Sequence, residues 1–488
     1  MNEIDRLKKD PVFAQENTLL GIVHLARDTE FGKKYNFKLI KNIADFQKNV
    51  PLCHYEDIVP FIEKMMVGDG DILWPGLVTN FSKSSGTTAR SKFLPVSTEL
   101  LESCFKAGQD ELGLYLKNNP DTGILEGKSV FVGGSLKKIK EDPEIFCGDI
   151  SAIMMHGLPS IGEYFRTPSL EVATMENYEE KLEKLAEETM KENITSLAGV
   201  PTWTIALIKK VVAKAGAQNI LEVWPNLEVF FHGAVSFEPY RKLFRELIPT
   251  PTMRYMEAYN ASEGFFAIQD NLSLPGEMLL MPDYGVFYEF ISMKEYGKEN
   301  PKIYTMADVK IGENYALIIS TNAGLWRYLI GDTVMFTSLF PHRIKITGRT
   351  KHFINAFGEE VMVHNTDTAI KEACEKTGAR ISEYTVCPIF LEKDSRGGHE
   401  WIVEFEKEPE NLEYFVEILD SKLRVVNSDY DAKRFRDIVL SKPVLHSVPV
   451  NTFYNWMKTH DKLGGQHKVP RLSNSREYVE DILKFNVL

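Results

Sequence analysis

A hydroxyl-rich turn around one glycine is the segment of this sequence best suited to binding a polyphosphate. Residues 81–95 read FSKSSGTTARSKFLP. Hydroxyls and exposed backbone N–H groups donate to phosphate oxygens, glycine lets the backbone come close, and a lysine offsets negative charge. A solvent-exposed Ser/Thr-rich loop would have the same composition. The residues expected to hold phosphates are Ser84, Ser85, Gly86, Thr87, Thr88 and Lys92.

A second segment, YNASEG at residues 259–264, offers a carboxylate and an aromatic ring. The preceding run TMRYMEA has strand composition, so Glu263 is expected to project from a loop at the edge of a sheet. A carboxylate suits Mg²⁺ that also binds phosphates, and a tyrosine face can stack on adenine. Alternatively, Ser-Glu-Gly is typical of a helix cap. The candidate residues are Tyr259, Asn260, Ala261, Ser262 and Glu263.

The third candidate is Asp332 in WRYLIGDTV, where Gly331 is expected to break a strand and present the carboxylate. An ionised carboxylate accepts hydrogen bonds only, which suits paired ribose hydroxyls. A Gly-Asp hairpin turn would have the same pattern. Arg349 follows 17 residues later in GRTK, and Lys468 and Arg471 lie in GGQHKVPR near the C-terminus. A lone lysine near a chain end is usually only solvated.

Two other segments resemble nucleotide signatures but lack their spacing. GILEGKS at residues 123–129 has three residues between its glycines, whereas a Walker loop has four. GDGDIL at residues 68–73 has Leu73 where a dinucleotide fingerprint needs its third glycine. The first is therefore not a P-loop, and a surface turn is the better interpretation of the second.

The elements that would position these residues alternate between helices and strands, which indicates an α/β fold with a helical layer over residues 1–78. Pro201 and Gly216 bound an amphipathic helix in GVPTWTIALIKKVVAKAG. LEVFFHGAV is predicted to be a buried strand that ends in small residues. ENYALIIS, GLWRYLI and TVMFTSL are predicted to be successive strands separated by NAG and GD turns.

The C-terminal part is predicted to be a smaller α+β domain. It reads as a helix at 364–379, a strand from 381, a turn at KDSRGGH, a strand at EWIVEFE and a helix near 411–427. The boundary is placed within ITGRTKHF, which divides the chain into a large domain, residues 1–348, and a small mobile domain, residues 349–488.

Bulk composition describes a mixed globular protein of 488 residues with a formal charge of -12. The excess of acidic over basic residues argues against nucleic acid or anionic membranes as partners, since binding to either needs clustered Lys and Arg. The chain has no apolar run long enough for a secretory signal or a membrane span, and a cytoplasmic location is expected. Its dispersed cysteines contain no C-x-x-C pair and are expected to be reduced thiols: Cys53, Cys104, Cys147, Cys374 and Cys387.

The order of these motifs resembles the acyl-adenylate-forming superfamily of luciferases, acyl-CoA synthetases and peptide-synthetase adenylation domains. Within it, the chain is most similar to the auxin-responsive Gretchen Hagen family of acyl-acid amido synthetases. SSGTTARSKFLP matches that family's phosphate loop, and GVPTW, YNASE, WRYLIGD and QHKVPR match four further motifs across residues 75–475. The superfamily loop's second glycine is absent, His467 replaces the family's usual tyrosine, and GRTK is closer to the general superfamily hinge.

The resemblance implies a large domain of β-sheets flanked by helices, a mobile small domain, and ATP and Mg²⁺ as ligands. Lys468 would neutralise charge on the reacting carboxylate and α-phosphate, and Glu263 would bind the metal. Asp332 and Arg349 would hold the ribose, and Tyr259 would pack on adenine. The HGAV segment, including Gly233 and Ala234, would line the adenine and acyl side, although His232 is equally interpretable as a core histidine.

The implied reaction is adenylation of a carboxylic acid followed by acyl transfer to an amine, by family analogy an amino acid. Trp203 and Phe231 are candidates for the acyl pocket. An acyl-CoA or aryl-CoA ligase would share the first half-reaction, and a non-catalytic adenylate-binding protein would retain the fold. The acid, the acceptor and the general base are not specified by the sequence, and a monomer is expected.

Overall fold

Helices form the N-terminal layer, as the spacing of apolar residues predicts. In the computed structural model, Asp10 caps α2 (Pro11–Ala26) by accepting from the backbone N–H of Phe13, and Pro11 occupies the first turn. The next helices are α3 (Glu30–Lys34), η1 (Phe37–Leu39), α4 (Ile43–Asn49) and α5 (Tyr55–Met66). The structure describes residues 9–84, 92–141, 143–158, 160–175, 177–234, 237, 240–350, 353–354, 359, 361–389, 397–427, 430–431, 434, 440–460, 469–473 and 475–485.

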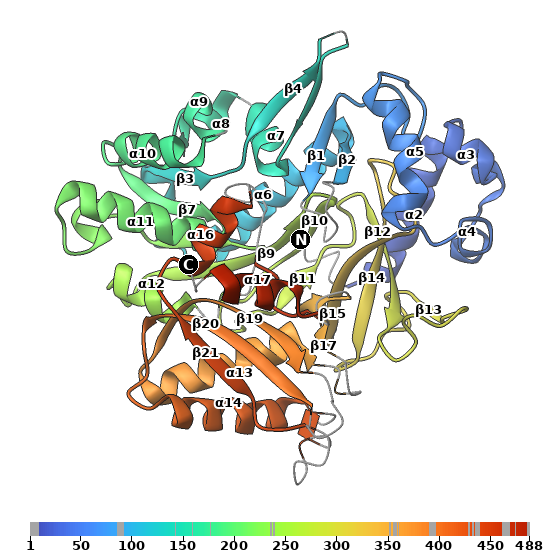
Figure 1. The fold of residues 1–488 in the computed structure, drawn as a ribbon. Coiled ribbons are helices and arrows are strands. Elements are labelled where there is room, and N and C mark those ends of the chain that lie inside the picture. Colours follow the sequence, from blue (N-terminus) through green and yellow to red (C-terminus); the bar gives the residue numbers. More distant parts are fainter. Residues whose placement is uncertain are drawn as a thin grey trace. The chain divides into compact units, whose positions relative to one another are not determined.

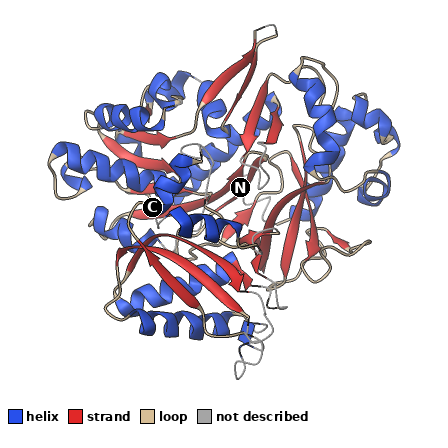
Figure 2. Ribbon diagram, in the orientation of Figure 1, coloured by secondary structure: helices blue, strands red, loops and turns tan. Residues whose placement is uncertain are grey.

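Two compact units make up the chain. The first consists of residues 1–235, 247–330 and 334–345, and the second of residues 236–246, 331–333 and 346–488. Both combine helices and sheets (Figures 1 and 2), so the predicted α/β class is confirmed. Among the described helices, none has the combination of length and apolar character that crossing a bilayer requires.

Twelve of the described strands form one sheet, in the order β13-β12-β14-β15-β16-β11-β10-β9-β8-β7-β3-β6. Strands β6, β3, β7, β8 and β9 run parallel, and β10 and β11 continue antiparallel. Their bounds are β3 (Lys128–Val132), β6 (Arg166–Thr167), β7 (Ile194–Gly199), β8 (Val229–His232), β9 (Arg254–Ala261), β10 (Gly264–Ile268), β11 (Met278–Leu280), β12 (Val286–Ser292), β13 (Ile303–Tyr304), β14 (Asn314–Thr321), β15 (Tyr328–Leu339) and β16 (His342–Arg349).

A four-stranded sheet, in the order β2-β1-β5-β4, carries the two ends of the hydroxyl-rich turn. Its strands are β1 (Asn80–Ser84), β2 (Lys92–Val96), β4 (Leu136–Lys140) and β5 (Ile145–Gly148). Helices between the strands are α6 (Thr98–Asn118), η2 (Ile124–Glu126), α7 (Ile150–His156), α8 (Ser160–Tyr164), α9 (Leu170–Ala173), α10 (Tyr178–Thr189), α11 (Pro201–Ala215), η3 (Ile220–Glu222) and α12 (Arg241–Leu247).

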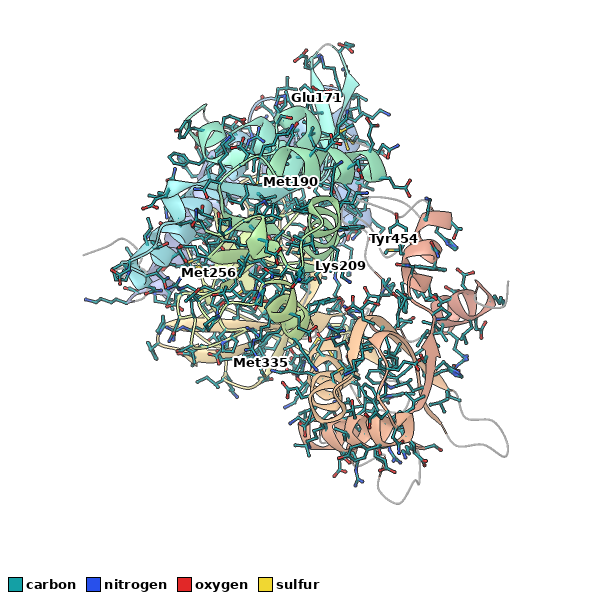
Figure 3. All side chains as sticks on the ribbon, turned by 90° about the vertical axis from the view of Figure 1, so that its left-hand side faces the viewer. Glu171, Met190, Lys209, Met256, Met335 and Tyr454 are labelled. Carbon is teal, nitrogen blue, oxygen red and sulfur yellow. The ribbon has the colours of Figure 1, made fainter. Side chains whose placement is uncertain are left out.

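The long helix α6 packs on the sheet through its apolar face. Leu100 and Tyr115 of this helix share a buried cluster with Met256 of β9 and Ile268 of β10. Figure 3 labels Met256 among the side chains of the structure. The helix predicted from GVPTW is also confirmed: α11 begins at Pro201 and ends before Gly216, which has a left-handed φ of 66°.

The second unit contains a three-stranded sheet, β19-β20-β21, between two pairs of helices. Trp401 packs toward α13 and α14, whereas Ile402 packs with Trp456 and Ile482 on the opposite face. The predicted helix, strand, strand and helix are confirmed, and β21, α16 and α17 were not predicted. The bounds are β17 (Phe353–Ile354), β18 (Val361–Met362), α13 (Val363–Thr377), β19 (Arg380–Ile389), β20 (Gly398–Lys407), α14 (Leu412–Val426), β21 (Val444–Val448), α16 (Thr452–Thr459) and α17 (Glu477–Phe485).

One local prediction and one alternative interpretation are wrong. Gly331 does not break a strand, because β15 runs continuously from Tyr328 to Leu339 and Gly331 accommodates a φ of 90° within it. Ser262 and Glu263 do not cap a helix, because they form the two-residue connection between β9 and β10. In both places the flanking strands pair with neighbours in the large sheet, and this pairing decides the local structure.

Candidate functional site

The carboxyl ends of the parallel strands bring three of the predicted motifs to one edge of the sheet. Val132 of β3 pairs with Gly199 of β7, and Gly199 pairs with His232 of β8. His232 in turn lies opposite Glu257 of β9, which continues to Ala261. Ligands of open α/β sheets bind outside this end of the strands. The segments GVPTW, HGA and YNASEG therefore all begin at the edge where a ligand is expected.

Close backbone packing holds the HGA segment against β9. A Cβ on Gly233 would lie 2.6 Å from the carbonyl oxygen of Ala258 and 3.2 Å from Oδ1 of Asn260, so only glycine fits there without a shift. Ala234 follows with a φ of 72°. His232 is buried with its ring near Phe230, as the core interpretation of this histidine expects.

The metal-binding candidate Glu263 lies in the tight β9–β10 connection, and its side chain is only 6% exposed. Oγ of Ser82 donates a hydrogen bond of 2.9 Å to the carbonyl oxygen of the neighbouring Ser262. Ser82 belongs to β1, the strand that leads into the hydroxyl-rich turn. The predicted phosphate-binding and metal-binding segments are thus joined by a direct contact across 180 residues of sequence.

Lys92 lies at the other end of the same turn, between two tyrosines. Its Nζ donates to the Tyr328 hydroxyl at 3.3 Å, and it lies 5.2 Å from the ring centre of Tyr55 and 5.8 Å from that of Tyr328. The Tyr55 hydroxyl accepts from the backbone N–H of Phe93 at 2.9 Å, which ties helix α5 to β2. Tyr328 belongs to the WRYLIGD motif, so a third predicted motif joins the turn. Tyr55 was not predicted, because its approach to Lys92 has no signal in local spacing.

Tyr259 has a different environment from the one expected. It is 4% exposed, and its ring meets that of Phe266 edge-on at 4.9 Å between centroids. In this structure the side chain therefore packs in the core of the sheet. Stacking on adenine would require this packing to open.

Asp332 and Arg349, the predicted ribose-binding pair, contact each other within the second unit. Asp332 Oδ1 lies 2.9 Å from Arg349 Nε, with the side chains 14% and 40% exposed respectively. The backbone N–H of Thr350 donates to the carbonyl oxygen of Gly331 at 2.7 Å and holds β15 and β16 together at this point. A surface-accessible carboxylate and guanidinium are both able to bind hydroxyl groups.

Several predicted residues lie outside the part of the chain that the structure describes. These are Ser85, Gly86, Thr87 and Thr88 in the turn, Val235 after β8, Lys351 in GRTK, and Lys468 with the preceding residues 461–467. For Ser84 only the backbone, at the end of β1, is described.

The chain that follows Lys468 is firmly attached to β19. Thr385 Oγ1 donates to the carbonyl oxygen of Pro470 at 2.6 Å, and the backbone N–H of Val386 donates to the carbonyl oxygen of Arg471 at 2.9 Å. The guanidinium of Arg471 lies over the ring of Tyr384 at 4.5 Å. Lys468 therefore directly precedes a well-anchored segment.

A resident metal centre is not evident within the described ranges, where no three His, Cys, Asp or Glu side chains gather. The buried carboxylate of Glu263, close to the strand that leads into the predicted phosphate-binding turn, fits a different arrangement. Mg²⁺ favours one or two carboxylates and completes its coordination with phosphate oxygens and water. Glu263 would meet that requirement once a nucleotide supplies the phosphates.

Comparisons with known proteins identify similar families and relatives. Models of the GH3 family N-terminal, central and C-terminal domains match residues 1–253, 279–349 and 364–477. The chain is 24% identical to the indole-3-acetic acid-amido synthetase GH3.3 of Arabidopsis thaliana over 96% of this chain and 90% of that protein. It is 24% identical to the jasmonoyl–L-amino acid synthetase GH3.5 of Oryza sativa subsp. japonica over 100% and 97%.

Solved structures show the same fold. The GH3.15 acyl acid amido synthetase matches with a TM-score of 0.78 at 18% identity, covering 99% of this chain and 95% of that one. A 2-hydroxyisobutyryl-CoA ligase in its postadenylation state matches with a TM-score of 0.62 at 13% identity, covering 100% and 94%. The two comparisons show that this chain shares the fold of these proteins.

Proposed function

The chain belongs to the GH3 family, and from this membership and the site geometry we propose that it is an ATP-dependent acyl-acid amido synthetase. It converts a small carboxylic acid to an acyl-adenylate and pyrophosphate, and then transfers the acyl group to an amine, in our proposal an amino acid. Relatives named for indole-3-acetic acid and jasmonoyl conjugation support an acid and an amino acid as the substrate classes. We further propose a monomer that acts in the cytoplasm.

The contact between Ser82 and the carbonyl of Ser262 is the observation that carries this proposal. It joins the strand leading into the hydroxyl-rich turn to the connection that contains Glu263. Lys92 lies at the far end of that turn, beside Tyr328. Hydroxyls, a lysine and a carboxylate are the groups needed to bind a nucleoside triphosphate together with Mg²⁺.

In the first half-reaction, a carboxylate oxygen of the acid attacks the α-phosphorus and pyrophosphate leaves. The protein supplies position and charge rather than a nucleophile. Lys92 and the turn hold the phosphates, Asp332 and Arg349 hold the ribose, and Lys468 neutralises the reacting carboxylate and α-phosphate. When bound through Glu263, Mg²⁺ supplies positive charge that stabilises the departing pyrophosphate.

In the second half-reaction, the amine nitrogen attacks the acyl carbon, the bond to the phosphate oxygen breaks, and AMP leaves. The nitrogen loses a proton, and an amide forms. The HGA segment and the start of α11 lie at the same sheet edge as the nucleotide motifs. This supports a position for the acyl group between HGA and the start of α11.

The first experiment is a panel of aromatic and aliphatic acids screened for acid-dependent pyrophosphate release, with ATP and a mixture of amino acids. We expect release with at least one acid and an amide product by mass spectrometry. Replacing the amino acids with CoA tests the ligase alternative, because hydroxylamine cleaves a thioester and leaves an amide intact. A thioester product would replace the amide assignment, and no release with any acid would reject adenylation.

A further inference from the structure

The edge of the sheet that carries the nucleotide motifs continues onto β7 and β3. The strands β8 and β9 end in HGA and YNASEG. We assign YNASEG to ATP, and HGA to the boundary between the adenine and the acyl group. The acid must therefore bind beside them, outside the carboxyl ends of the next parallel strands. Strand β7 ends at Gly199 and β3 at Val132, and these two residues are paired. The chain that leaves β3 is the glycine-rich loop 133–135, which the sequence analysis did not single out.

A buried lysine binds this loop from one side. Nζ of Lys181 on α10 donates to the carbonyl oxygens of Gly133 at 2.6 Å and Gly134 at 2.8 Å. The residue is only 4% exposed, and burial lowers the pKa of its ammonium group to about 8. Burying an ammonium group is costly unless it is well paired. An apolar residue would fill the same space more cheaply, so the carbonyl contacts give a reason for a lysine here.

The opposite side of the loop is bound by the start of α7. Oδ2 of Asp149 accepts from the backbone N–H of Ser135 at 2.8 Å, and Oγ of Ser151 accepts from that of Gly134 at 3.0 Å. A Cβ added to Gly134 would lie 1.8 Å from Asp149 Oδ2. Both peptide units of the loop are thus hydrogen-bonded on both sides, and a side chain at Gly134 would break the arrangement.

This arrangement makes the loop a rigid surface at the edge of the sheet. Helix α10, which carries Lys181, lies next to β3 and packs against α11, the helix that starts beside the expected acyl group (Figure 1). We propose that Lys181 is a positioning residue for the acid substrate, because it fixes loop 133–135 as one wall of the acid-binding side. The inference rests on the proposed function, since it assumes that the neighbouring loops bind ATP.

Lys181→Met tests this role in the full-length enzyme. The apolar side chain cannot bind the two carbonyl groups, so the loop should lose its fixed conformation. We expect the KM for the acid to rise at least tenfold and the KM for ATP to stay within twofold, both measured by pyrophosphate release. Lys214→Met is the matched control, because Lys214 makes exposed ion pairs with Glu183 and Glu187 on the neighbouring helix. It should leave both constants unchanged.

Gly134→Ala disturbs the same loop from the other side and should reproduce the increase in KM for the acid. Both variants should also change the ranking of acids in the panel in the same way. If the other variants do not fold, Asp149→Asn is measured in their place. It keeps the size of the side chain, weakens the hydrogen bond from the backbone N–H of Ser135, and should likewise raise the KM for the acid.

The outcomes separate the inference from the proposed function. The positioning role would be overturned if the folded Lys181 and Gly134 variants kept the wild-type KM for the acid. It would also be overturned if the KM for the acid and the KM for ATP rose equally, while the wild-type enzyme remained active. A wild-type protein that activates no acid would overturn the proposed function and this inference together.

Discussion

At the scale of single residues, two lysines near the proposed site have ammonium groups with specific oxygen partners. The ammonium group of Lys92 donates to the Tyr328 hydroxyl. That of Lys181 donates to two carbonyl oxygens of loop 133–135. Such contacts offset part of the cost of removing an ammonium group from water. A charged residue in the core without this compensation should instead lower stability.

Glu111 on α6 is partly exposed, but one oxygen of its carboxylate lacks such compensation. Its Oε1 is buried with no hydrogen-bond partner among the described residues, and burial raises the pKa of its carboxyl group from 4.5 to about 8. Because the pKa is raised in the folded state, Glu111 destabilises the fold progressively as pH rises from about 4.5 to about 8. Below this window the carboxyl group is protonated in both states and no penalty applies.

Glu111→Gln removes the ionisation and keeps the shape. We expect its free energy of unfolding to exceed that of the wild type by about 2 to 4 kcal/mol at pH 8.5, with a much smaller difference at pH 4.5. Urea unfolding at pH 4.5, 6.5 and 8.5 measures this. A difference that does not change with pH would contradict the assignment.

At the scale of elements, hydrogen bonds between distant segments decide where the functional side chains lie. The short segment 469–473 pairs with β19, and Arg471 connects it to two further parts of the second unit. Its guanidinium lies between the rings of Tyr240 and Tyr384 and forms an ion pair with Glu383. The side chain of Arg471, which is 14% exposed, thus adds to the backbone contacts that anchor the segment after Lys468.

Arg471→Met should therefore destabilise the protein by about 3 kcal/mol, because it leaves the largely buried carboxylate of Glu383 without its partner. The control is Arg380→Met, which removes a more exposed pair with Glu246 and should cost less than about 1 kcal/mol. Urea unfolding of both variants gives the comparison. Equal losses would mean that burial of the Arg471 pair contributes nothing beyond a surface contact.

At the scale of the whole molecule, the proposed function assigns ATP contacts to residues of both compact units. Glu263 and Lys92 belong to the first, and Asp332 and Arg349 belong to the second. Each set of assigned contacts is therefore tested within its own unit.

Hydrogen exchange with and without ATP and Mg²⁺ tests this assignment. We expect slower amide exchange in β9 and β10 of the first unit and also in residues 346–350 of the second. The strands β19 and β20, which contain none of the assigned residues, provide the internal reference. Protection confined to the first unit would remove Asp332 and Arg349 from the proposed site.

The sequence by itself determined the family, the α/β class and the elements that have local signals. Pro201 and Gly216 mark the ends of α11 because proline fixes its own φ and glycine adopts a left-handed φ without steric cost. Four consecutive elements, α13, β19, β20 and α14, were likewise predicted from their periodicity and turns. The site motifs were found by their order, since the residue types that bind ATP recur at characteristic places along the chain.

Only the tertiary structure decided how β15 passes through Gly331, how Ser262 and Glu263 turn between strands, and how Tyr259 packs on Phe266. The two hydrogen bonds from Lys181 to loop 133–135 could not be predicted from the sequence either. The carbonyl groups that accept them lie 47 and 48 residues away, and no spacing rule relates residues at that distance. Local patterns report the conformational preferences of neighbouring residues. Pairing between strands and the burial of charge depend on segments that meet only when the whole sheet has formed.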